Sequence, residues 1–147
     1  MSMYNTFGFG RHSKGASFEK IEIKRNDCGD DDVVIDLKYC GVCHSDVHIA
    51  DNDMGRTNYP CIPGHELAGV VTQVGRRVRR VVVGEEVGVG CMVDSCGDCR
   101  QCELQQEMFC MSNAVQTYNT NINYGSVKTD RGWTFGGYTD KITVPQG

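Results

Sequence analysis

The sequence reads Cys96-Gly97-Asp98-Cys99-Arg100-Gln101-Cys102, and a fourth cysteine, Cys110, follows after seven further residues. Two-residue gaps let successive thiolates turn toward one centre, and Gly97 allows the tight backbone that this needs. The longer gap brings the fourth sulfur back to close a tetrahedron. Because four thiolates in a small lobe are the usual ligands of a structural zinc ion, we expect residues 91–112 to fold around one.

An iron–sulfur cluster is the alternative for these cysteines, because C-x₂-C-x₂-C also begins a ferredoxin motif. That motif continues as C-x₂-C-x₂-C-x₃-C-P. In this sequence the last gap is seven residues long, and Met111 instead of proline follows Cys110. The spacing therefore favours zinc over iron.

Composition limits what kind of protein the chain can be. Its 147 residues suffice for one domain, and 18 glycines suit a strand-rich fold with many tight turns. A net charge of −4 argues against general attraction to nucleic acid. The first residues lack the pattern of a signal peptide, and no apolar run approaches the length of a membrane span. Nine cysteines cannot all pair as disulfides, which favours metal binding in a reducing compartment. From these features together we expect a soluble, cytoplasmic protein without nucleic-acid or membrane partners.

Patterns of β-strands dominate the rest of the chain, with β-branched runs separated by glycine turns. They predict a mainly β fold, a barrel or a sandwich. Helices are predicted at 45–50, with Ser45 as N-cap, and near 99–106. The polar stretch 111–133 is predicted to be a long surface loop. The predicted strands are 18–25, 33–39, 66–74, 81–83, 87–89 and 137–144.

A second cluster begins with Cys40-Gly41-Val42-Cys43-His44, which formally has the C-x-x-C-H signature of c-type haem attachment. The missing export signal argues against haem. Ser45-Asp46-Val47-His48 follows directly, and Pro63-Gly64-His65-Glu66 comes later. A thiolate, an imidazole and an adjacent carboxylate are what a catalytic zinc needs when one coordination position stays open for substrate.

Together these segments resemble zinc-dependent alcohol dehydrogenases of the medium-chain dehydrogenase/reductase family. The matches are residues 41–48, 63–69 and the four-cysteine segment, in the same order and at similar spacing, with further matches at 83–90 and 136–138. They look closest to the cinnamyl-alcohol and broad-specificity aldehyde reductase branch, and extend from about residue 21 to 144. The resemblance implies a GroES-like fold, a partly open β-barrel with a zinc-binding lobe and one or two short helices.

The resemblance also implies a catalytic zinc site. Cys43 and His65 would bind this zinc, and Glu66 would be an alternate ligand when substrate or water leaves. Asp46 would not bind the zinc itself, but would hydrogen-bond to the imidazole of His65 and hold it in place.

Further roles follow from the same resemblance. Ser45 and then His48 would pass the proton of a bound alcohol to solvent. His44 would face the phosphates of a nicotinamide cofactor, which the resemblance predicts to be NADP. Cys40 and Cys61 match no functional position, so we expect a buried strand thiol and a core residue, respectively.

Members of this family are more than twice as long and continue into a Rossmann domain that binds the cofactor. Gly8-Phe9-Gly10-Arg11-His12-Ser13 lacks the third glycine of the G-x-G-x-x-G fingerprint. The third protein ligand of the catalytic zinc, a cysteine in the family, would lie beyond residue 147.

We therefore expect residues 1–147 to form only the catalytic domain, a truncated enzyme that is inactive by itself on small alcohols and aldehydes. Its catalytic zinc site would be weak, and NADP would bind only to a full-length protein. Exposed strand edges or the cofactor-facing surface would favour self-association. The alternative is a non-catalytic zinc-binding interaction module derived from the same family.

Overall fold

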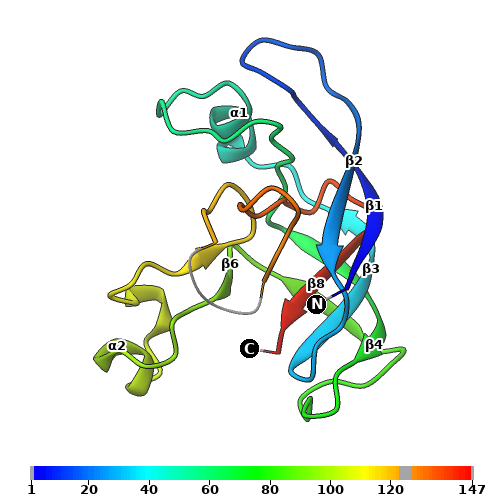
Figure 1. Cartoon of the computed structure of the whole chain (residues 1–147), viewed down its shortest axis with the longest axis vertical. Coiled ribbons are helices and arrows are strands. Elements are labelled where there is room, and N and C mark those ends of the chain that lie inside the picture. The colour runs from blue at the N-terminus through cyan, green and yellow to red at the C-terminus, as the bar shows by residue number, and fades with distance from the viewer. Residues whose placement is uncertain (1, 123–126, 147) are drawn as a thin grey trace.

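The computed structural model describes residues 2–122 and 127–146. It consists mostly of strands in three small antiparallel sheets, with two short α-helices and one 3₁₀ turn (Figure 1). The largest sheet has the order β5–β4–β3–β8, in which β5 is Glu86–Val89, β4 is Leu67–Val74, β3 is Asp32–Cys40 and β8 is Lys141–Pro145. The predicted mainly β, partly open fold is confirmed, since the three sheets do not close into one continuous barrel.

The core of the central sheet explains why β3 and β4 form where they do. Val33, Val34 and Ile35 are all buried, so both faces of β3 are covered at this end of the sheet. Ile35 packs in one cluster with Val71 of β4 and Ile142 of β8. β-Branched side chains suit this packing because their restricted rotamers fit a pleated surface.

The first hairpin, β1 (Met3–Gly10) with β2 (Glu19–Asn26), contains a strand that the sequence patterns did not predict. Thr6 and the glycines of β1 point inward, while Phe7 and Phe9 are 42% and 59% exposed. A Cβ atom on Gly10 would lie 2.1 Å from the carbonyl oxygen of Cys61, so only glycine allows this close approach. The apolar alternation of β1 is therefore reversed relative to an ordinary half-buried strand.

Helix α1 (His44–Ala50) begins one residue earlier than predicted, and its N-cap is Cys43 instead of Ser45. The carboxylate of Asp46 accepts a hydrogen bond from the Cys43 backbone N–H, which satisfies one of the free donors at the helix start. The predicted helix near 99–106 is shorter than expected: α2 spans Arg100–Glu103, and the 3₁₀ turn η1 spans Glu107–Phe109.

Two further sequence predictions are wrong. Residues 81–83 form no strand; Val82 and Val83 are 67% and 60% exposed in the connection between β4 and β5. The segment 111–133 is not simply a surface loop, because β7 (Val115–Gln116) pairs with β6 (Met92–Asp94), and Val115 is buried. This pairing joins segments that are distant in sequence, which local periodicity cannot reveal.

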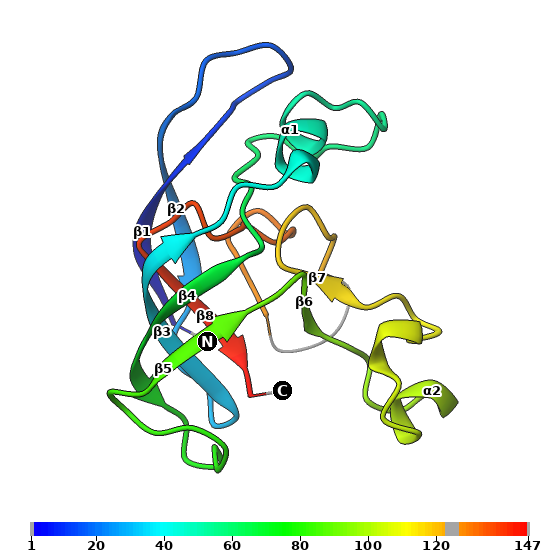
Figure 2. The ribbon, with the colours of Figure 1, turned by 180° about the vertical axis from the view of Figure 1, so that it is seen from behind.

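The lobe that carries α2 projects away from the central sheet, as Figure 2 shows from behind. Within the described residues, no helix is long and apolar enough to span a membrane.

Candidate functional site

The carboxylate of Asp46, which is 3% exposed, organises the candidate site. Its Oδ1 accepts from the backbone N–H of Gly64 at 2.9 Å, and its Oδ2 accepts from the backbone N–H of Cys43 at 3.0 Å. The hydroxyl of Tyr138 donates to Oδ2 at 3.1 Å, and burial raises the pKa of this phenol, which keeps it protonated. His65 Nδ1 lies 3.2 Å from Oδ1. Because the carboxylate can only accept, Nδ1 carries the imidazole proton.

This arrangement leaves the lone pair of His65 Nε2 facing two other potential ligands. One ligand atom each from Cys43, His65 and Glu66 lie within 4.8 Å of one another, and Nε2 is 3.9 Å from the Glu66 carboxylate. Gly41 gives the carboxylate room, since a Cβ there would lie 2.3 Å from Glu66 Oε2. A thiolate, a neutral imidazole and a carboxylate could hold a zinc ion with a position left for another ligand.

Ser45 lies at the edge of this cluster. Its hydroxyl is 3.3 Å from Cys43 Sγ, to which it donates, and 3.5 Å from His65 Nε2. An exchangeable hydroxyl therefore stands beside the three potential metal ligands.

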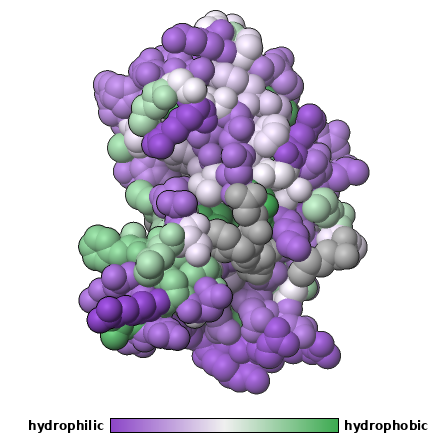
Figure 3. Space-filling view, turned by 60° about the vertical axis from the view of Figure 1, so that its left-hand side comes forward, coloured by the Kyte–Doolittle hydropathy of each residue, from purple (hydrophilic) through white to green (hydrophobic). Residues whose placement is uncertain are grey.

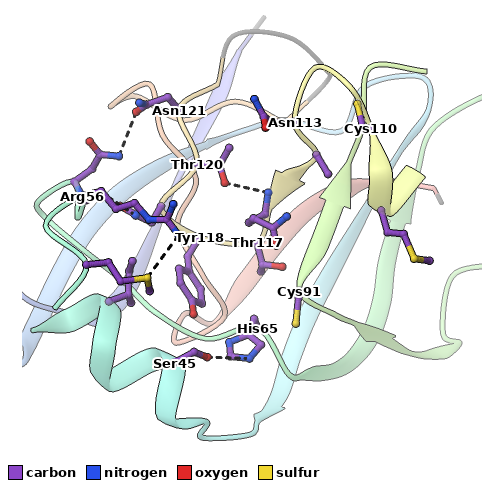
Figure 4. A pocket seen from close by; sticks show the side chains of 17 residues that line it. Ser45, Arg56, His65, Cys91, Cys110, Asn113, Thr117, Tyr118, Thr120 and Asn121 are labelled. Atoms are coloured by element: carbon purple, nitrogen blue, oxygen red, sulfur yellow. Dashed lines mark hydrogen bonds between the residues drawn. The ribbon is translucent and has the colours of Figure 1, made fainter. Parts of the chain in front are cut away.

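A cavity of about 850 Å³ opens beside Ser45 and His65 (Figure 4). Its opposite wall comes from residues 113–121, within the stretch that the sequence pattern predicts to be a surface loop. The ring of Tyr118 lies edge-on to His65, with centroids 5.5 Å apart. Nothing in the local sequence pattern marked this wall, because its polar residues have no strand or helix periodicity.

His44 and His48 are exposed on α1, and their ring centroids are 4.6 Å apart. His48 Nδ1 lies 2.8 Å from the carboxylate of Asp53. The hydroxyl of Ser45 instead contacts Cys43 and His65, so the two members of the predicted proton relay have separate partners in this structure.

Of the two cysteines without a predicted role, Cys61 has the expected core environment, whereas Cys40 is only partly buried and not buried as predicted. Cys61 is 3% exposed, and burial raises the pKa of its thiol to about 12. Cys40 ends β3 and is half-buried, and this partial burial also raises the pKa of its thiol.

The four-cysteine lobe brings all four predicted sulfurs together, each within 4.8 Å of the others. The Sγ atoms of Cys96 and Cys102 are 3.8 Å apart, and those of Cys99 and Cys102 are 3.5 Å apart. A tetrahedral zinc site with bonds of about 2.3 Å has sulfur–sulfur edges of about 3.8 Å. Gly97 has φ +73°, so the tight turn that the motif requires uses glycine's freedom.

Backbone N–H groups favour the thiolate form in this lobe. The N–H of Met111 donates to Cys99 Sγ at 3.4 Å. Together with the backbone N–H of Cys102, it lowers the pKa of Cys99 to about 6. A backbone donor at Cys96 also lowers the pKa of Cys110, whereas the side chain of Asp98 raises the pKa of Cys96 to about 12. Thiolates are the form that binds metal, so the backbone donors at Cys99 and Cys110 fit a zinc site.

Comparison with known proteins identifies the family. Residues 29–147 match the family model described as the alcohol dehydrogenase GroES-like domain. The chain belongs to the alcohol dehydrogenase family. This membership confirms the family inferred from the sequence motifs.

Among its curated relatives, this alcohol dehydrogenase domain is 49% identical over 133 residues to a probable formaldehyde dehydrogenase of Bacillus subtilis. It is 45% identical over 139 residues to cinnamyl alcohol dehydrogenase 7 of Oryza sativa. The matches cover 90% and 95% of this chain, but 36% and 35% of those proteins. The chain thus spans little more than a third of the length of these relatives.

Solved structures agree with this assignment. A cinnamyl alcohol dehydrogenase of Sorghum bicolor matches with a TM-score of 0.89 and 35% identity, covering 97% of this chain and 39% of the sorghum chain. One from Helicobacter pylori, complexed with NADP(H), matches with a TM-score of 0.87 and 38% identity, covering 98% and 40% of the two chains.

Proposed function

We propose that this chain is the zinc-binding catalytic domain of an enzyme that interconverts alcohols and aldehydes with NADP(H). We assign residues 1–147 to this one domain and residues 91–112 to its zinc lobe. The family supports the reaction class, and the Helicobacter pylori neighbour in complex with NADP(H) supports the choice of cofactor. Small alcohols and aldehydes are the proposed substrates.

One observation carries the proposal: the buried Asp46 fixes the His65 tautomer, so that Nε2 faces Cys43 and Glu66 beside a cavity. Cys43 and His65 are the proposed zinc ligands, and Glu66 is the proposed alternate ligand. When bound there, zinc would lower the pKa of an alcohol and polarise the carbonyl of an aldehyde. The hydrogen-bond donors around Asp46 hold its carboxylate in place. The carboxylate in turn orients the imidazole of His65 and keeps the Nδ1 proton on the side away from the metal.

Proton movement is assigned to Ser45 and His48. The Ser45 hydroxyl stands 3.5 Å from His65 Nε2, and it can accept a proton from an adjacent alcohol while it releases its own hydroxyl proton to the next group of the relay. His48 is exposed and paired with Asp53, so it can exchange a proton with solvent. Because Ser45 and His48 have separate partners, a further hydroxyl between them is needed to complete the relay. His44, exposed at the start of α1, is the proposed contact for the cofactor's phosphates.

For the lobe we propose a structural zinc ion held by its four thiolates, and not an iron–sulfur cluster. The support is the mutual approach of the sulfurs, all within 4.8 Å. In an iron–sulfur cluster the four thiolates are distributed over two or more iron atoms. Their sulfur atoms therefore lie farther apart than those of four thiolates that bind one zinc ion.

None of the nine cysteines forms a disulfide, which fits a reducing compartment. We propose that the protein works in the cytoplasm. The 147 residues contain no G-x-G-x-x-G fingerprint. We therefore expect a polypeptide of these residues alone to lack alcohol dehydrogenase activity, because hydride transfer needs a bound nicotinamide.

Two measurements test this function. The chain loaded with cobalt in place of zinc should show thiolate-to-metal absorption from two sites, and Cys43→Ser should remove only the weaker one. Native mass spectrometry should find one tightly held zinc ion and a second that mild chelation removes.

A chimera provides the activity test. These residues replace the matching part of the Helicobacter pylori enzyme, and the product should reduce aldehydes with NADPH only when Cys43 is intact. An active Cys43→Ser chimera would contradict the proposal. Two zinc ions per chain that both survive mild chelation would contradict the weakness of the second site.

A further inference from the structure

The cavity beside His65 has an unusual distribution of charge. The 17 residues that line it include no aspartate, glutamate or lysine, although the chain has 19 acidic residues and a net charge of −4. Arg56 is the one lining residue with a permanent charge. Figure 4 shows its side chain reaching into the cavity from the segment that follows α1, while Ser45 of α1 and His65 lie at another edge.

The guanidinium of Arg56 has no acidic partner among the described residues, although two carboxylates lie close by in the sequence. Asp51 is paired with Arg11, and Asp53 is paired with His48. The contact that remains for Arg56 is a 3.6 Å approach of its Nη2 to Met54 Sδ, which is a weak acceptor. Its charged donors are therefore available to a ligand.

Amide side chains hold the backbone around Arg56 in place. Asn119 donates through Nδ2 to the Arg56 carbonyl at 3.2 Å and accepts the backbone N–H of Asn58 at 2.7 Å. Asn58 in turn donates to Asn121 Oδ1 at 3.2 Å. The rim that carries the guanidinium is thus tied to the opposite wall of the cavity before any ligand arrives, which lowers the cost of ordering it on binding.

We propose that Arg56 forms an anion subsite, and that the substrate of this cavity is an alcohol or aldehyde that carries a carboxylate at its other end. This inference rests on the proposed function, which places the reacting oxygen beside Ser45 and His65. A guanidinium matches a carboxylate because it can donate two parallel hydrogen bonds. A cavity of about 850 Å³ has room for a molecule with two functional ends.

The cofactor's phosphates are the other source of an anion. The lining favours the substrate, because Arg56 shares one cavity with Ser45 and His65. His44, the residue proposed for phosphate contact, does not line that cavity.

The test compares two ligands of the same shape, para-(hydroxymethyl)benzoate and its neutral carboxamide. Each is titrated into the zinc-loaded, isotope-labelled 147-residue chain, and the dissociation constant is read from amide chemical shifts. We expect the carboxylate to bind about twofold to fivefold tighter than the carboxamide, the range for a charged pair at a solvent-accessible rim. Added salt should reduce this preference.

Three variants locate the effect. Arg56→Gln should abolish the preference for the carboxylate without weakening the carboxamide, and Arg56→Lys should keep part of it. Arg131→Gln, which removes an exposed arginine outside the cavity lining, should change neither ligand. The amide spectrum shows whether Arg56→Gln is folded. If Arg56→Gln does not fold, Arg56→Lys, which keeps the positive charge but loses the planar guanidinium, tests the same contact.

Equal binding of the two ligands by the wild-type chain would overturn the inference, and so would a preference that survives Arg56→Gln. Inorganic phosphate and NADP⁺ are titrated in parallel. If Arg56→Gln weakens these two and spares the carboxylate ligand, the subsite belongs to the cofactor and the substrate assignment is overturned. Because binding is measured without turnover, failure of the subsite is distinguishable from failure of the chimera to reduce aldehydes.

Discussion

Replacing Tyr138 with phenylalanine is the most direct test of how the site is held together. The Tyr138 hydroxyl donates to Asp46 Oδ2 at 3.1 Å, across a sequence separation of 92 residues. This bond ties the segment before β8 to the carboxylate that orients His65. Phenylalanine keeps the ring and its packing against a buried cluster, so the variant removes a hydrogen bond without creating a cavity. The buried members of this cluster are Ile21, Ile23, Ile62 and Phe135.

The size of the effect follows from the contacts of Asp46. A hydrogen bond to a charged group contributes about 1.5–3 kcal/mol. Three other donors to Asp46 remain, and Tyr138 is only half-buried, so we take the lower end of this range. We expect Tyr138→Phe to lower the free energy of unfolding of the metal-free chain by about 1.5 kcal/mol. A less firmly held His65 should also weaken metal binding at its site by about tenfold.

Urea unfolding of the metal-free chain measures the first effect, and cobalt titration measures the second. Tyr118→Phe is the control for a hydroxyl lost elsewhere at the site, because the Tyr118 hydroxyl interacts with Ser45 and the Tyr138 hydroxyl with Asp46. Cobalt bound in the four-cysteine lobe should be unaffected in both variants. If Tyr138→Phe matches Tyr118→Phe in both measurements, the hydroxyl does not support Asp46 and the reasoning is refuted.

Three further predictions concern the lobe, the core and the surface. Cys99→Ser should release the lobe's zinc and loosen residues 94–112 in hydrogen exchange while the central sheet stays protected; Cys91→Ser, an exposed thiol outside the four, should retain the ion. Burial raises the pKa of Cys61 from 9.0 to about 12, so over this pH interval an unfolded chain loses a proton that the folded chain keeps. The free energy of unfolding should therefore fall as the pH rises from about 9 to about 12, and Cys61→Ala should flatten this dependence in urea titrations. Phe109 on the lobe is 65% exposed among other exposed apolar side chains, and Phe109→Ser should reduce the self-association of the chain in sedimentation velocity.

Each of these predictions has a contrary outcome. A Cys99→Ser protein that retains tightly bound zinc would remove Cys99 from the ligand set. An unfolding free energy with the same alkaline pH dependence in Cys61→Ala would assign that dependence to other groups. A wild-type chain that stays monomeric at high concentration would show that the apolar surface of the lobe, visible in Figure 3 where that side of the molecule is turned forward, drives no association.

The central sheet could be predicted from sequence because its strands are locally marked. Residues 33–39 and 66–74 were predicted as strands, and β3 and β4 lie at Asp32–Cys40 and Leu67–Val74. Runs of β-branched residues produce this signal wherever a strand is buried. β1 escaped prediction because its inward face consists of Thr6 and glycines, which leave room for the close approach of Cys61. That requirement belongs to a neighbouring segment, so β1 itself has no ordinary amphipathic pattern.

The two groups of potential metal ligands also differ in how far the sequence alone could predict them. The lobe's four cysteines lie within 15 consecutive positions, so their spacing alone restricts how the sulfurs can meet. Cys43, His65 and Glu66 were assigned through family resemblance, and the structure brings their ligand atoms within 4.8 Å. The residue types at each position, and with them the family and the kind of metal ligand, are properties of the sequence by itself.

Only the tertiary structure decided what surrounds those ligands. It placed Tyr138 against Asp46, turned His48 toward Asp53, and set Arg56 in a cavity without acidic neighbours. Local sequence patterns report which face of an element is buried, and they say nothing about which distant element covers it. Hydrogen bonds and cavity walls depend on positions to within a fraction of an ångström, and those positions come from the packing of segments that are far apart in the chain.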